Sequence, residues 1–126
     1  MSIAPTEWLK QADYDLETAE FMFGGGRYFY AVFMCHQAVE KAIKGLYRHK
    51  LGETPPRVHN LVYLLSRVDV SPAEKTGKFI VRLNEANIAT RYPDDLEKLQ
   101  SDYTKEAVRE VLDGSKEVIQ WIKKRL

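Results

Sequence analysis

Residues 28–50, YFYAVFMCHQAVEKAIKGLYRHK, decide the fold of this chain. The first eight residues are apolar around whole helical turns, which predicts a central helix covered on several sides. Its second half carries an apolar stripe at Val39, Ala42, Ile43 and Leu46, with polar residues on both sides. We therefore expect one central helix, ended by Gly52 and the two prolines that follow, with the other segments packed around it.

Amphipathic segments precede and follow this helix. Apolar residues recur every three or four positions over about 5–23, 72–91 and 102–125, and a shorter segment of two to three turns begins near His59. Ser71 and Pro72 suit the cap and first residue of a helix, and Tyr92-Pro93 suits a helix end. We predict an all-α fold, an antiparallel up-and-down helical bundle of four long helices plus one short helix, in a single domain over 1–126.

Composition narrows the classes of function. Lys and Arg number 19 against 18 Asp and Glu, so the net charge of +1 argues against bulk binding of polyanions. The single cysteine, Cys35, excludes an internal disulfide and a metal site built on two cysteines. We expect a cytoplasmic protein without a signal peptide or membrane association, because neither kind of apolar segment is visible.

Charge is nevertheless segregated along the chain. Residues 7–20 contain five acids and one base, whereas residues 40–57 contain five bases and two acids. A basic segment of this size can orient a nucleotide or a short RNA, or contact an acidic surface such as the first helix of another subunit.

Two polar stripes are the candidate sites. His36, Glu40, Lys41 and Lys44 share a broad face of the central helix, although ordinary pairing of Glu40 with Lys44 on a solvated face would give the same spacing. Asn84, Asn87 and Arg91 recur on the fourth long segment and Tyr92 follows, a set that suits phosphate and base recognition. Arg91 near a helix end can instead cap carbonyl groups.

Two other motifs are weaker evidence for a functional site. Gly24-Gly25-Gly26-Arg27 predicts a flexible helical hairpin, because the spacing of a phosphate loop is missing. His36, His49 and His59 do not have the spacing of a metal motif, so we expect no metal and no cofactor.

The combination of several of these residues resembles the HEPN family. The resemblance rests on Trp8, Ala12, Leu16, Arg27-Tyr28, Ala31, Phe33, the run from His36 to Lys44, His59-Asn60-Leu61, Leu64-Leu65 and Arg91-Tyr92-Pro93. It implies an all-helical, intracellular, homodimeric protein, similar to small stand-alone prokaryotic members that accompany a minimal nucleotidyltransferase in toxin–antitoxin operons. The family name records proposed nucleotide binding.

The resemblance also bears on catalysis. Active members are metal-independent ribonucleases with an Arg followed after four to six residues by a His, and no such spacing occurs in this chain. Arg91 can supply a cation for phosphate, and only His36 or His59 could then supply the acid or base.

We therefore predict a HEPN-like module that binds a nucleotide or RNA, or a nucleotidyltransferase partner, as a homodimer. The alternatives are a divergent ribonuclease of the toxin type and a purely structural interaction module. The predicted binding residues are Arg91, Tyr92, Asn87, Lys41, Lys44, His36, Glu40 and His59.

Overall fold

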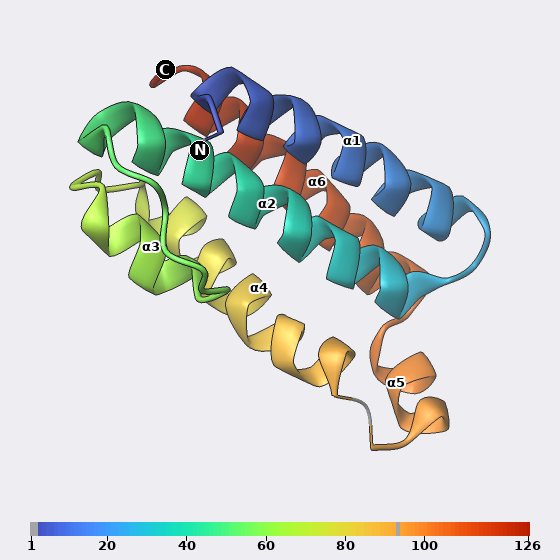
Figure 1. The fold of residues 1–126 in the computed structure, drawn as a ribbon. Helices are drawn as coiled ribbons and strands as arrows, with labels where there is room; N and C mark the ends of the chain where they lie inside the picture. Colours follow the sequence, from blue (N-terminus) through green and yellow to red (C-terminus); the bar gives the residue numbers. More distant parts are fainter. Residues whose placement is uncertain (1–2, 93) are drawn as a thin grey trace.

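The protein, described from a computed structural model over residues 3–92 and 94–126, contains six helices and no strand within those residues (Figure 1). The helices are α1 (Pro5–Gly24), α2 (Tyr28–Leu51), α3 (Leu61–Arg67), α4 (Glu74–Arg91), α5 (Leu96–Asp102) and α6 (Lys105–Lys123). The four long helices alternate in direction, which confirms the predicted antiparallel bundle. None of the helices within the described residues is long and apolar enough to cross a membrane.

Helix α2 is central, as its apolar sequence predicts. It packs against α1, α3, α4 and α6, and Val39, Ala42, Ile43 and Leu46 are fully buried. The predicted contrast between its halves is wrong in part. Tyr30 in the apolar half is 52% exposed, whereas Glu40 and Lys44 in the polar half are only 5% and 7% exposed. The reason is tertiary, because α3 and the loop before it cover the polar half.

Two helix starts differ from the sequence prediction, and the structure has one short helix that was not predicted. Helix α4 begins at Glu74 instead of Pro72, and the N-cap is Ala73 without a side-chain hydrogen bond, so Ser71 is not the cap. Its first backbone bond runs from the Gly77 N–H to the Ala73 carbonyl. A second short helix, α5, follows the break near Tyr92, with Asp95 accepting from the Lys98 N–H. Helix α6 consequently starts at Lys105, capped by Thr104.

The acidic face of α1 is neutralised within the chain. Asp13 pairs with Lys123 of α6 at 2.9 Å, and Asp15 pairs with Lys41 of α2 at the same distance. Glu20 contacts Lys116 and Arg109 of α6, and the hydrogen bond from Lys116 is the main cause that lowers the pKa of this carboxyl. The acids of α1 are therefore paired mainly with bases of α6, and Lys41 is the residue of the basic segment 40–57 that pairs with α1 among the described residues.

Close packing of α1 on α2 depends on Gly45. A methyl group there would overlap a Leu9 methyl and approach Trp8 Cβ to 3.0 Å and the Pro5 carbonyl oxygen to 3.2 Å. At Gly77 of α4, the nearest atom would be Pro72 Cγ at 3.8 Å. Substitution by alanine should therefore change the free energy of unfolding in opposite directions at the two positions.

We expect Gly45→Ala to lower the free energy of unfolding by about 1 kcal/mol or more, because overpacking outweighs the better helix propensity. Gly77→Ala should raise it by about 0.5–1 kcal/mol, because only the propensity changes. Urea unfolding followed by circular dichroism measures both, and equal stabilisation by the two substitutions would contradict the close α1–α2 contact at Gly45.

Candidate functional site

The buried carboxylate of Glu40 is the centre of a polar cluster on α2. Its Oε2 accepts a hydrogen bond from Lys44 Nζ at 3.0 Å, and its Oε1 lies 3.0 Å from His59 Nδ1. The side chain of His59 is 54% exposed. With Nδ1 donating to the carboxylate, the other ring nitrogen of His59 is left as the group that a ligand can meet.

His59 reaches this position because two asparagines hold the start of α3. Asn60 caps the helix by accepting from the Tyr63 N–H at 2.9 Å. Asn84 of α4 accepts from the Leu61 N–H at 2.8 Å. These bonds satisfy two free N–H groups at the helix start and tie α3 to α4, so the loop that carries His59 lies against α2. Asn84 was part of the predicted polar stripe, but its role is structural.

His36 lies one turn before Glu40 and is fully buried. Its Nδ1 is 3.7 Å from Glu40 Oε1, and neither ring nitrogen has a hydrogen-bond partner. Burial lowers the pKa of His36 from 6.5 to about 4, opposed by the negative charge of Glu40 and assisted by the positive charges of Arg91 and His59. His36 is therefore neutral at physiological pH.

Helix α4 contributes further polar groups without partners. Asn87 is 7% exposed, and its Oδ1 is buried and makes no hydrogen bond. The guanidinium of Arg91 lies 5.2 Å from the ring centre of Phe33, and its buried Nε is also without a partner. Among residues 3–92 and 94–126, Arg91 forms no ion pair. A buried polar atom without a partner is costly, so this region suits a polar ligand or ordered water.

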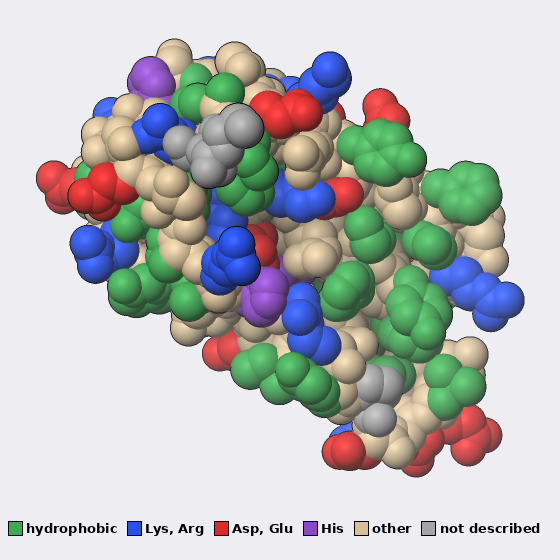
Figure 2. Space-filling model, viewed as in Figure 1, with side chains coloured by type: hydrophobic (Ala, Val, Ile, Leu, Met, Phe, Trp, Pro, Cys, Tyr) green, Lys and Arg blue, Asp and Glu red, His purple; other side chains and the backbone are tan. Residues whose placement is uncertain are grey.

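We call the set of His36, Glu40, Lys44, His59, Asn87 and Arg91 the α2–α4 cluster. Figure 2 shows a histidine among basic side chains near the middle of the visible face, where the loop before α3 meets α2 and α4. Glu40 of α2, His59 of the loop before α3 and Arg91 of α4 all lie close enough to His36 for their charges to affect its pKa.

Two predicted residues lie apart from this cluster. Lys41 is paired with Asp15 of α1 at 2.9 Å, because its position on α2 faces α1. Tyr92 is 71% exposed at the C-cap of α4. Phe33, which lies beneath Arg91, was not among the predicted site residues, although it is one of the residues that carry the family resemblance.

The cluster is not arranged as a metal centre. Within the described part of the chain, no group of three or more His, Cys, Asp or Glu side chains could hold an ion. Glu40 is already bonded to Lys44 and His59, and a cation at this carboxylate would have to displace them.

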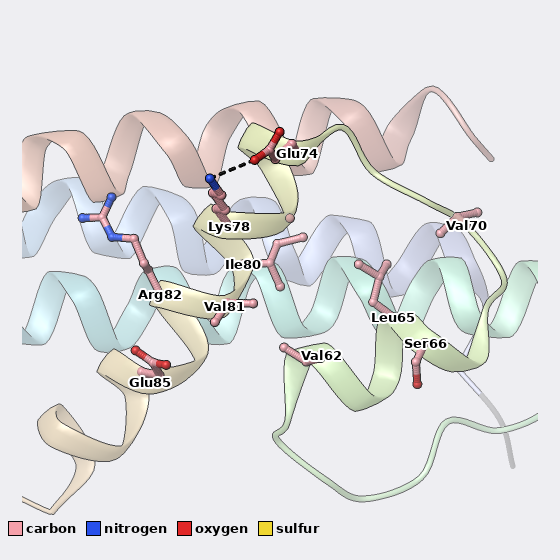
Figure 3. Close-up of a pocket in the computed structure, with 11 residues that line it drawn as sticks. Val62, Leu65, Ser66, Val70, Glu74, Lys78, Ile80, Val81, Arg82 and Glu85 are labelled. Atoms are coloured by element: carbon pink, nitrogen blue, oxygen red, sulfur yellow. Dashed lines mark ion pairs between the residues drawn. The ribbon is translucent and has the colours of Figure 1, made fainter.

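A large cavity lies elsewhere, between α3 and the first half of α4 (Figure 3). It has a volume of about 740 Å³, and Val62, Leu65, Ile80 and Val81 point into it. The charged residues at its rim include the paired Glu74 and Lys78, 2.9 Å apart. The polar part of its lining consists of exposed side chains, among them Ser66, Lys78 and Arg82, and it includes none of the buried polar atoms without partners found among the described residues.

The low pKa of His36 makes stability depend on pH. Well above pH 6.5 the ring is neutral in both the folded and the unfolded chain, so His36 does not lower the free energy of unfolding there. As the pH falls toward 4, the unfolded chain binds a proton that the folded chain does not, so unfolding is favoured. We expect about 2 kcal/mol to be lost between pH 8 and 5 through this residue.

Urea unfolding at both pH values measures the loss. His36→Leu should remove most of it, whereas His49→Gln, at an exposed position near the end of α2, should leave it unchanged. An equal pH dependence in the wild type and in His36→Leu would show that His36 titrates normally.

Comparison with known proteins identifies the fold. Residues 6–126 match the family model of the HEPN domain. The crystal structure of TT1696 from Thermus thermophilus superposes with a TM-score of 0.86 at 30% identity, covering 97% of this chain and 98% of that chain. ST0689, described as an archaeal HEPN homologue, gives a TM-score of 0.79 at 26% identity and covers 98% of both chains. No curated protein matches significantly. The chain therefore belongs to the HEPN domain family.

Proposed function

We propose that this HEPN chain is a binding module for the phosphate of a nucleotide or RNA, and that the α2–α4 cluster is the site. The observation that carries the proposal is the set of buried polar atoms without partners on His36, Asn87 and Arg91, next to the half-exposed His59. A phosphate oxygen would give the guanidinium of Arg91 an acceptor, and a hydroxyl of the ligand could donate to the second ring nitrogen of His59.

The electrostatics of the cluster favour an anion on the Arg91 side. Glu40 neutralises Lys44, so Lys44 contributes less to binding than the sequence suggested. The guanidinium of Arg91 lies over the ring of Phe33, and its N–H groups can donate to two oxygens of one phosphate. A local site of this kind agrees with a net charge of only +1, because it does not depend on a basic surface.

Homodimerisation is part of the same proposal. Phe21 and Tyr14 of α1 are 79% and 71% exposed. Figure 2 shows hydrophobic side chains spread over the end of the bundle near the α1–α2 turn. Large exposed apolar groups are typical of protein–protein contacts. A minimal nucleotidyltransferase partner and a toxin–antitoxin context stay predictions of the family resemblance.

A ribonuclease is the second candidate, favoured by one observation. His59 is oriented by a buried carboxylate, as an acid–base histidine is in many hydrolases, and its free nitrogen is accessible. The positive charge of Arg91 contributes to the low pKa of the neighbouring His36. Metal-free incubation with labelled RNA tests this candidate, and cleavage that is lost in His59→Gln but kept in His49→Gln would support it.

Binding of AMP and of a short RNA, measured by isothermal titration calorimetry, tests the phosphate site. We expect Arg91→Ala to weaken binding about tenfold or more, because a charge-assisted contact is lost. Arg82→Ala is the matched control, since Arg82 is exposed on the same helix and forms no ion pair among the described residues. No binding of either ligand, or equal losses in the two variants, would contradict the proposal.

A further inference from the structure

A smaller hollow lies at the other end of α2, between the α1–α2 turn and α5. Its volume of about 390 Å³ falls in the range of small-ligand pockets. Arg27, Tyr28 and Tyr30 line it from the start of α2, and Gln100 and Tyr103 line it from the end of α5. No residue of the α2–α4 cluster belongs to this lining.

The side chains around this hollow are those that recognise a flat heteroaromatic ring. The rings of Phe29 and Tyr30 lie 4.5 Å apart, and Tyr28 packs edge-on against Phe23 with ring centres 5.5 Å apart. Neighbouring rings therefore restrict the tyrosines, which reduces the entropy lost when a base stacks on them.

Polar groups accompany these rings. The amide of Gln100 can both donate to and accept from the edge of a base. Burial is the main cause that raises the pKa of Tyr103, so its hydroxyl remains a donor. Arg27 is exposed and can stack on a base or contact its phosphate.

The hollow adjoins the phosphate site. A neighbouring cavity of about 330 Å³ is lined by Thr90 and Arg91 and shares Phe29, Tyr30 and Leu96 with the first. Asp94 and Asp95 also line this cavity, and their carboxylates would repel a phosphate that came close to them. A ligand whose phosphate contacts Arg91 away from these carboxylates could extend past Tyr30 into the hollow, because Phe29, Tyr30 and Leu96 line both cavities.

We propose that the hollow between the α1–α2 turn and α5 binds the nucleobase of the ligand whose phosphate contacts Arg91. This inference rests on the proposed function and names the part of the ligand that supplies its selectivity. The base stacks on Tyr30 or Tyr28 and hydrogen-bonds to Gln100. The nucleobase can belong to a free nucleotide or to an RNA, because the stacking chemistry is the same.

Calorimetric titration with AMP, adenosine and ribose 5-phosphate tests the base pocket. We expect AMP to bind about tenfold more tightly than ribose 5-phosphate, as a single stacked base would give. Tyr30→Leu and Gln100→Ala should reduce this preference, and Gln100→Ala should leave the affinity for ribose 5-phosphate unchanged because Gln100 does not line the cavity next to Arg91. Gln120→Ala, at an exposed position on α6, is the control for Gln100→Ala.

The outcomes separate this inference from the proposed function. Equal affinities for AMP and ribose 5-phosphate, or equal effects of Gln100→Ala and Gln120→Ala, would overturn the base pocket alone. Binding of adenosine without binding of ribose 5-phosphate would support the pocket and contradict the phosphate site, and no binding of any probe would overturn both.

A competition experiment between hexaadenylate and AMP identifies the source of the nucleobase. Competition would support the pocket with RNA as the source, whereas AMP binding without competition would support the pocket with a free nucleotide as the source.

Discussion

The buried carboxylate of Glu40 is the interaction on which the arrangement of the site depends. A carboxylate inside a helical bundle is costly unless hydrogen-bonded partners surround it. Lys44 supplies one partner from the next turn of α2, and His59 supplies the other from the loop before α3. Because the second partner is distant in the sequence, satisfying Glu40 also fastens that loop to α2. Asn84 then fastens the start of α3 to α4, so one buried charge helps set the positions of three helices.

The same charge divides the polar cluster into two parts. On the Glu40 side, the carboxylate and its two donors satisfy one another. On the Arg91 side, His36 and Asn87 leave polar atoms unpaired, and the guanidinium rests on an aromatic ring without an ion pair among the described residues. Other charged groups in the bundle are also paired with opposite charges, since acids of α1 form ion pairs with bases of α2 and α6. The polar groups around Arg91 have no such partners, and we therefore place the ligand next to them.

Much of the fold follows from the sequence, because the apolar periodicity of the long helices is strong. Helix α5 was missed because it has seven residues, of which only Leu99 is buried, and so short a segment shows no period. The start of α4 was misplaced because Ser71-Pro72 has the composition of a helix start, whereas the first backbone bond of the helix begins at Ala73.

The site was less predictable than the fold. Spacing on α2 placed both Lys41 and Lys44 near Glu40, but only the position of α1 decides that Lys41 pairs with Asp15. Pairing of His59 with Glu40 joins residues 19 positions apart across a loop, which no helical spacing can indicate. Helical spacing and the family resemblance indicated the candidate residues, and the tertiary structure decided which of them meet.

The α2–α4 cluster, held together by Glu40, is proposed to receive a phosphate, and NMR can observe this directly. The histidine ring signals in two-dimensional spectra are followed during titration with AMP. We predict saturable shifts of the His59 ring signals, with the His49 signals unchanged and the His36 ring neutral throughout. Shifts of His49 equal to those of His59, or no shift of His59 at saturating AMP, would contradict a phosphate site at this cluster.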